Sequence, residues 1–149
     1  MRNNFAAKGG CFEITSSELD AVNSTFEGNF AMQGGVVFAI SGSFMQIDSS
    51  EIFKNMAQDS SVVYAMSNQL KQGFQINTVL IPLYSETGTP LEALRFTRSN
   101  IHDNFATANT IQLLLSSMQI SDCEMYDNYA HYVTHGVTLI QSQLLVKST

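Results

Sequence analysis

Apolar and polar positions along the chain repeat with a period of about 25 residues. In the segment FEGNFA at residues 26–31, an apolar residue stands three places before an asparagine, and an alanine stands two places after it. The same arrangement recurs at Asn4, Asn29, Asn55, Asn77, Asn104 and Asn128, with spacings of 25, 26, 22, 27 and 24 residues. A fixed period of this length indicates a repeat architecture and takes precedence over local helix and strand assignments.

The columns on either side of these asparagines are apolar in every copy. The position three before holds Met1, Phe26, Ile52, Phe74, Ile101 and Met125, and the position two after holds Ala6, Ala31, Ala57, Val79, Ala106 and Ala130. The clearest copies continue into a glycine pair and a strand-like run, KGGCFEI at 8–14 and QGGVVFAIS at 33–41. Short runs of this kind, without heptads or a long 3.6-residue stripe, are typical of β-strands.

These patterns predict an all-β fold, a right-handed parallel β-helix solenoid of about six turns that occupies residues 1–149 as one segment. Turns stacked about 4.8 Å apart align each column into a ladder, in which asparagines share amide hydrogen bonds. The fourth copy lacks the glycine pair and contains Pro82 and Pro90, which predicts an irregular loop at about 80–94. The alternative is a β-sandwich in which the repetition is accidental.

Composition narrows the classes of partner. With 44% hydrophobic residues the chain can bury one core, and only 13% of its residues are charged. Lys and Arg together number 7 and the net charge is -6, so no basic stripe is available to bind nucleic acid. The longest apolar run, TVLIPLY at 78–84, is too short to span a bilayer, which predicts no membrane-spanning segment.

The segment FEGNFAMQGGVV at residues 26–37 resembles the FxxN and GGA[ILV] repeats of the chlamydial polymorphic membrane proteins. Similar repeats occur in very large surface proteins of ciliates, and all are similar to the pectin-lyase-like β-helix superfamily. The resemblance implies a noncatalytic β-helical module with a role in adhesion, scaffolding or assembly. It also implies an extracellular or cell-surface location, and a protein partner or a stack of copies, with carbohydrate as the alternative partner.

One face of the predicted strands is a candidate partner-binding surface. In the family pattern, the residue after Gly-Gly-x points inward, which places Phe12, Val37 and Val63 in the core. The alternate, outward positions are mostly apolar, and an apolar outer face is normally covered. The candidate binding residues are Phe38, Ile40, Tyr64, Met66, Leu113, Leu115 and Leu139. The alternatives are that inside and outside are exchanged, or that the 80–94 loop folds back over this face.

An enzyme is the alternative function, because many pectin-lyase-like β-helices cleave acidic polysaccharides with carboxylates on an outer face. Asp103 and Asp127 share one column in neighbouring turns, with His102 adjacent, and could raise one another's pKa or hold a cation. Lys54 occupies the same column but lies two turns away in the six-turn alignment, so nothing basic completes the site. The interpretation is therefore two solvated turn aspartates, no assigned catalytic residue and no enzyme.

The remaining candidate sites predict no cofactor and no metal. His131 and His135, with Asp127, have a spacing that holds zinc on a helix, but here it falls across a β-turn and the start of a strand. Asn23-Ser24-Thr25 is a glycosylation sequon, which has meaning only in a eukaryotic secretory pathway. Cys11 and Cys123 show neither a metal-binding spacing nor a disulfide framework.

Both ends of the sequence fall close to copy boundaries. Met1 already occupies the apolar position of the first copy, and Thr149 lies 21 residues beyond Asn128. A solenoid needs polar caps at its ends, and neither end of this sequence predicts a capping helix. The expectation is that the chain is a segment of a longer solenoid or part of a stack.

Overall fold

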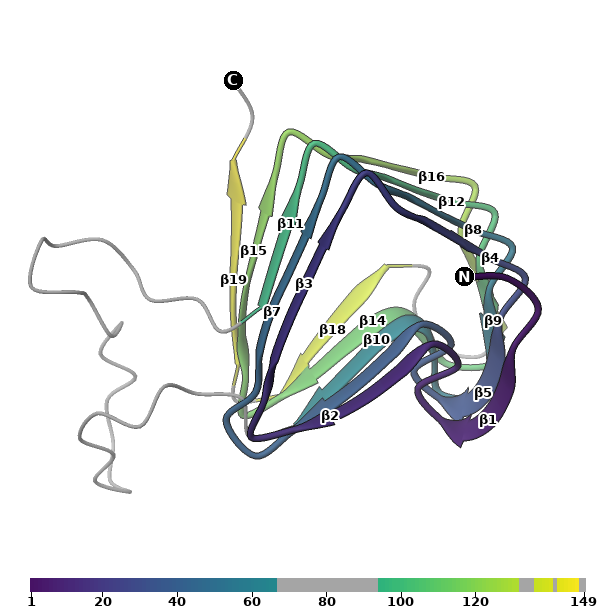
Figure 1. Cartoon of the computed structure of the whole chain (residues 1–149), viewed down its shortest axis with the longest axis horizontal. Coiled ribbons are helices and arrows are strands. Elements are labelled where there is room, and N and C mark those ends of the chain that lie inside the picture. The colour runs from purple at the N-terminus through teal and green to yellow at the C-terminus, as the bar shows by residue number, and fades with distance from the viewer. Residues whose placement is uncertain (67–93, 132–135, 141, 148–149) are drawn as a thin grey trace, which may run out of the picture.

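The structure is a computed structural model that describes residues 1–66, 94–131, 136–140 and 142–147. In this part of the chain every regular element is a β-strand, and all strand pairs are parallel. The chain coils in a right-handed sense into a solenoid of about four turns, each passing through the same four sheets in order (Figure 1). The predicted β-helix fold is confirmed, and the predicted six turns are too many.

Strands that follow one another by one full turn pair side by side. Sheet 1 contains β1 (Phe5–Lys8), β5 (Phe30–Gln33), β9 (Met56–Ala57), β13 (Phe105–Ala106) and β17 (Tyr129–Ala130). Sheet 2 contains β2 (Phe12–Thr15), β6 (Val37–Ile40), β10 (Ser60–Met66), β14 (Asn109–Leu114) and β18 (Val137–Ile140). Sheet 3 contains β3 (Glu18–Val22), β7 (Phe44–Asp48), β11 (Leu94–Thr97), β15 (Ser117–Ser121) and β19 (Gln143–Lys147). Sheet 4 contains β4 (Thr25–Glu27), β8 (Glu51–Phe53), β12 (Asn100–His102) and β16 (Glu124–Tyr126).

The core lies between the four sheets and is built from inward columns, one side chain per turn. Sheet 4 contributes Phe26, Ile52 and Ile101, which are fully buried. Across the interior, sheet 3 contributes the aligned Ile47 and Phe96. Because strand partners have identical positions in successive turns, an apolar residue at one such position requires an apolar residue above and below it. This constraint produces the repeat in the sequence.

Asparagines form a continuous buried ladder at the corner between sheets 4 and 1. Each carboxamide donates from Nδ2 to Oδ1 of the next asparagine, at 2.8 Å from Asn29 to Asn55 and at 3.0 Å from Asn55 to Asn104. The same Oδ1 atoms accept the backbone N–H of the preceding asparagine, at 3.0 Å in both steps. The asparagine ladder consists of Asn4, Asn29, Asn55, Asn104 and Asn128.

The second Nδ2 hydrogen explains why an apolar residue precedes each asparagine by three places. Asn55 donates to the carbonyl of Phe26, and Asn104 donates to the carbonyl of Ile52, each at 2.9 Å. These carbonyls belong to the residue three before the asparagine of the preceding turn. The side chain of that residue points into the core, so its carbonyl lies along the stacking direction where the amide can reach it. All four hydrogen-bonding positions of the Asn55 carboxamide are therefore occupied.

The fourth predicted copy is not a turn of this ladder. Asn55 bonds directly to Asn104, so no rung lies between them, although 49 residues separate the two in sequence. Asn77 itself lies outside the described residues, as does most of the predicted 80–94 loop. The predicted loop boundary is wrong by one residue, because Leu94, at the end of the predicted loop, begins β11 and is fully buried.

Left-handed residues occupy the corners of the solenoid. The residue before each ladder asparagine has a φ between 50° and 64°, and these residues are Asn3, Gly28, Lys54, Asp103 and Asp127. The corner between sheets 3 and 4 repeats this conformation at Asn23, Ser49, Arg98 and Asp122. A single left-handed residue changes the chain direction without breaking strand pairing on either side. Asn and Asp tolerate this conformation better than most residues, which accounts for their frequency here.

A second polar ladder, not anticipated from the sequence, follows the left-handed residues between sheets 3 and 4. The backbone N–H of Ser24 donates to Oγ of Ser50, and that of Ser50 donates to Oγ of Ser99, at 3.0 and 3.1 Å. The N–H of Ser99 then donates to Sγ of Cys123 at 3.4 Å. Each side chain in turn donates to the carbonyl two residues before it. Cys123 thus occupies a serine position, which explains its isolation in the sequence.

The glycine pairs have two different roles. Gly9 and Gly34 have φ values of 55° and 65°, as expected of glycine at a turn. Gly10 and Gly35 instead allow neighbouring turns to approach closely. A Cβ at Gly35 would lie 2.2 Å from the carbonyl oxygen of Ser61 in the next turn.

Replacing Asn55 with alanine is expected to destabilise the fold by about 3 kcal/mol or more, because it leaves several buried backbone and side-chain groups unpaired. Urea denaturation of Asn55→Ala measures this loss. The matched control is Asn4→Ala, at the first, partly exposed rung, where about 1 kcal/mol is expected. Equal losses for the two variants would contradict the importance of the buried ladder.

Replacing Gly35 with alanine is expected to cost about 3 kcal/mol, because the added methyl group meets a backbone oxygen that cannot move aside. Gly42→Ala is the control, since a Cβ at that position meets nothing within 4 Å. Its φ of 75° should limit the cost to about 1 kcal/mol. Thermal or urea unfolding of both variants tests the difference, and a smaller loss for Gly35→Ala would refute the close approach of the turns.

Candidate functional site

The outer face of sheet 2 carries the aromatic pair singled out in the sequence. Phe38 and Tyr64 lie on adjacent strands, β6 and β10, and their rings stack with centroids 5.4 Å apart. Phe38 lies outside the core cluster, yet it is only 2% exposed. The Lys8 ammonium lies 4.7 Å from the centre of its ring, at the end of β1. Phe38 is therefore already covered, and it offers a partner little surface.

Polar groups surround Tyr64. Burial, followed by the negative charge of Asp59, raises the pKa of the Tyr64 hydroxyl. Asp59 also accepts a hydrogen bond from Nε2 of Gln33 at 3.0 Å. In the next turns, Nδ2 of Asn109 donates to Gln112 at 3.2 Å. This face combines aromatic and hydrogen-bonding groups and is not a purely apolar surface.

Three of the predicted binding residues are misplaced by the alignment. Tyr64 pairs with Gln112, whereas the sequence repeat predicts Leu113. The cause is an extra residue in β10, seen as a register shift between Ser60 and Val63. A shift of one residue exchanges the two faces of a strand. Leu113 and Leu139 consequently belong to the inward column, with Leu113 fully buried, and Leu115 lies at a corner with a φ of 49°.

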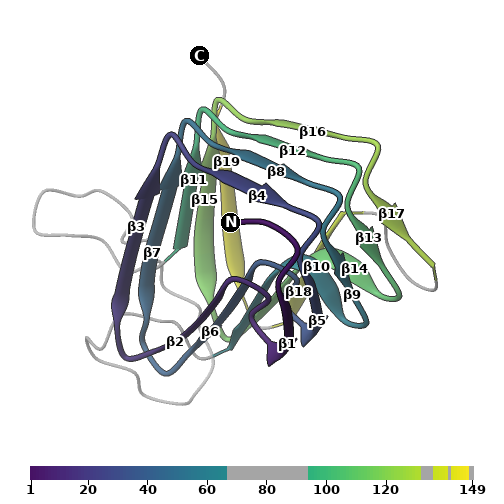
Figure 2. The same cartoon turned by 45° about the vertical axis from the view of Figure 1, so that its right-hand side comes forward.

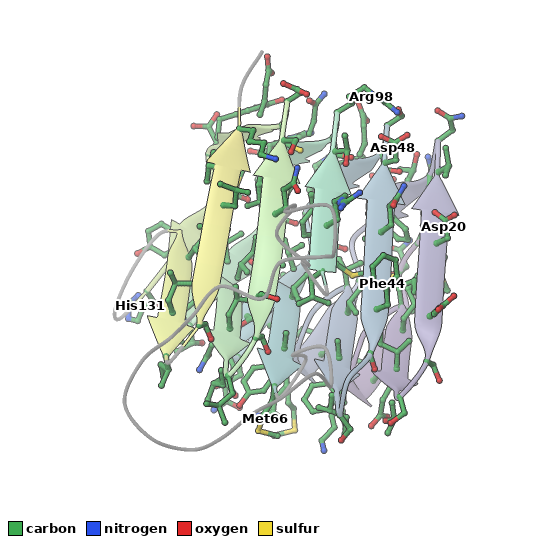
Figure 3. The ribbon with its side chains drawn as sticks, turned by 90° about the vertical axis from the view of Figure 1, so that its left-hand side faces the viewer. Asp20, Phe44, Asp48, Met66, Arg98 and His131 are labelled. Carbon is green, nitrogen blue, oxygen red and sulfur yellow. The ribbon has the colours of Figure 1, made fainter. Side chains whose placement is uncertain are left out.

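The other predicted outward residues of sheet 2 do point outward. Ile40 pairs with Met66 on the neighbouring strand, in the column next to that of Phe38 and Tyr64. Met66 is exposed and Ile40 is half-buried (Figure 3). Whether any of these residues contacts a partner stays a prediction.

A longer exposed apolar column runs along the outer face of sheet 1 (Figure 2). It consists of Phe5, Phe30, Met56, Phe105 and Tyr129, one residue from every turn, and it is called the ring column below. Apart from Phe30, which is half-buried, these side chains are 40% to 82% exposed. Contiguous exposed apolar groups on this scale mark interaction surfaces.

The rings of this column stack along the solenoid axis. Phe5 and Phe30 are nearly parallel, with centroids 4.9 Å apart, and Phe105 and Tyr129 are 5.3 Å apart at 15°. Stacked rings turn their faces toward one another and their edges toward solvent. The neighbouring outward column is leaner and consists of Ala7, Met32, Gln58, Thr107 and His131.

A sequence signal for the ring column exists. Each of its members immediately follows a ladder asparagine, in the dipeptides NF, NF, NM, NF and NY. The asparagine side chain and the alanine two places later both point inward, so the intervening residue must point outward. The fourth copy departs from this pattern with Asn77-Thr78, in agreement with its absence from the ladder.

The candidate acids of an enzymatic site have a conformational explanation. Asp103 and Asp127 are exposed, and they occupy left-handed corner positions with φ values of 52° and 50°. Lys54 stands at the same position one turn before Asp103, not two, because Asn55 and Asn104 are adjacent rungs. The Nδ1 atom of His102 lies 2.9 Å from a carboxylate oxygen of Asp103.

The His102 ring is held between two other rings on the outer face of sheet 4. Its centroid lies 5.2 Å from that of Phe53 and 4.8 Å from that of Tyr126, with both pairs nearly parallel. Both faces of the imidazole are thus covered, and Nδ1 is paired with Asp103. This arrangement stabilises the corner and orients the histidine edge-on to solvent.

The remaining candidates do not form a site in the described residues. No group of three His, Cys, Asp or Glu side chains there has metal-binding geometry. His135 lies outside the described residues, so the histidine pair is untested. Asn23 is exposed at a left-handed corner, and its glycosylation stays a prediction.

Neither cysteine has the character of a nucleophile. Burial raises the pKa of the Cys11 thiol to about 11 and raises that of Cys123 as well. Both are free thiols. A thiol with a raised pKa is mostly protonated at neutral pH and reacts slowly.

Comparisons with known proteins found no match: no family model, no curated protein and no solved structure matches the chain. The described residues include no helix with the length and hydrophobicity needed to cross a membrane.

The raised pKa of Cys11 predicts a stability change at alkaline pH. The folded state favours the neutral thiol, so this contribution is complete below the unfolded pKa of about 9 and is lost as pH rises toward about 11. The urea midpoint of the wild type should therefore fall more steeply over this range than that of Cys11→Ser. Parallel pH profiles for the two proteins would contradict the burial of this thiol.

Proposed function

We propose that the chain is a noncatalytic surface or structural module that binds a partner through a lateral face of its solenoid. The observation that carries this proposal is the ring column. It extends along every turn of sheet 1, and its side chains are far more exposed than the core requires. A flat, regular surface of this kind suits adhesion, scaffolding or assembly.

The likeness of the FxxN and Gly-Gly segments to polymorphic membrane protein repeats supports the same function. It also supports an extracellular or cell-surface location and a place in the pectin-lyase-like superfamily. The β-solenoid is compatible with that likeness, because the ladder gives the FxxN spacing a structural role. The asparagine of this motif maintains the fold, which leaves the residue after it available for binding.

A carbohydrate-active enzyme is less well supported. The candidate acids Asp103 and Asp127 serve as left-handed corner residues, and His102 is covered on both ring faces. Their arrangement has a structural explanation that requires no substrate. The proposal therefore assigns no catalytic role to these residues.

Retention on a phenyl-substituted matrix tests the binding face. The wild type should be retained, and Phe105→Ser should elute earlier because it removes an exposed ring from the ring column. Tyr126→Ser, on the outer face of sheet 4, is the control and should behave like the wild type. Equal retention of Phe105→Ser and the wild type would show that another surface is responsible.

Incubation with polygalacturonate and related acidic polysaccharides tests the absence of catalysis. Neither unsaturated products nor new reducing ends should appear. Cleavage that disappears in Asp103→Asn or Asp127→Asn would overturn the proposal and establish the enzyme.

A further inference from the structure

We infer that the partner of the sheet 1 face is a second copy of this chain, packed face to face with its solenoid axis parallel to that of the first. The inference rests on the proposed function, since it names the occupant of the same binding face. Three features of sheet 1 carry it: the exposed area, the absence of charge and the unequal size of its two outward columns.

The exposed area is sufficient for a weak dimer. The exposed fractions on this face are 82% for Phe5, 54% for Met32, 47% for Tyr129, 45% for Met56 and 40% for Phe105. At about 200 Å² for a fully exposed side chain of this size, they amount to about 500 Å² per copy. Two copies together bury about 1,000 Å², the lower limit for a specific interface, which predicts a micromolar, concentration-dependent dimer.

Charge distinguishes sheet 1 from the other faces. None of its ten outward residues is Asp, Glu, Lys or Arg. Sheet 4 presents Glu51 and Glu124 in one outward column, and sheet 3 presents Glu18 and Asp20 on β3 (Figure 3). Two copies of a chain with a net charge of -6 repel each other, and pairing through sheet 1 brings no carboxylates together.

The two outward columns of sheet 1 determine the orientation. A twofold axis parallel to the solenoid axis places the ring column of each copy against the leaner column of the other, for example Phe5 against Ala7 and Phe105 against Thr107. Large residues then fill the space beside small ones, as in a packed core. A twofold axis along the strands places Met56 against Met56 and ring against ring, which leaves the leaner columns apart.

The ring geometry favours a protein surface over a sugar. Carbohydrate rings stack on the electron-rich faces of aromatic side chains. In this column the faces of Phe105 and Tyr129 are turned toward each other, and so are those of Phe5 and Phe30. The exposed edges are suited to interdigitation with apolar side chains.

Sedimentation equilibrium over a range of concentrations tests dimerisation. The dissociation constant should rise about tenfold or more in Tyr129→Ser, which removes one buried aromatic side chain per copy. Tyr126→Ser is closely matched: it lies in the same turn, is 44% exposed against 47%, and also stacks on one neighbouring ring. It should dimerise like the wild type.

Disulfide trapping tests the orientation, in a Cys11→Ser, Cys123→Ser background. A mixture of Met56→Cys chains and Gln58→Cys chains should form the mixed disulfide, because these positions face each other across the parallel twofold axis. Met56→Cys chains alone should stay unlinked. Efficient self-linking of Met56→Cys would overturn the parallel arrangement.

A chain that remains monomeric at its highest soluble concentration would overturn the second copy as partner. So would dimers that weaken equally in Tyr126→Ser and Tyr129→Ser. If Phe105→Ser still reduces retention on the phenyl matrix, the sheet 1 face retains its binding role and the occupant is another molecule. If both experiments fail, the proposed function fails with the dimer.

Discussion

Each turn of the solenoid depends on one kind of buried group, the asparagine carboxamide at the corner between sheets 4 and 1. A buried amide is costly unless its two donors and two acceptor positions are all used. Here the asparagine of the next turn, and the backbone of the preceding one, satisfy them all. A turn with another residue at this position leaves its neighbours unsatisfied above and below. The ladder therefore fixes the register of successive turns.

The outer surface follows from this register. A left-handed residue precedes each ladder asparagine, an outward residue follows it, and an alanine points inward after that. Outward positions consequently align into columns along the axis, and similar residues in a column create a continuous surface. The ring column on sheet 1 is such a surface, located directly beside the ladder. Structure and candidate function are thus carried by adjacent positions of one repeat.

The sequence was sufficient to predict the fold, the asparagine ladder and the alanines beside it, because each has an invariant spacing within a turn. It was insufficient where the spacing between turns changes. Asn77 imitates the repeat but has no place between Asn55 and Asn104. One extra residue in β10 moved Leu113 from the predicted outer face into the core. The ring column was missed since attention fell on the glycine-rich strands, and the burial of Phe38 under Lys8 depends on contacts between sheets.

The direct junction of Asn55 with Asn104 is the central claim, and a shortened chain tests it most directly. The connection from β6 to β7 needs only Ser41-Gly42-Ser43. Residues 67–92 replaced by Ser-Gly-Ser should give a chain that retains the free energy of unfolding of the wild type, measured by urea denaturation, because loop length contributes only modestly. A shortened chain that fails to fold, or loses most of that free energy, would contradict the five-rung ladder.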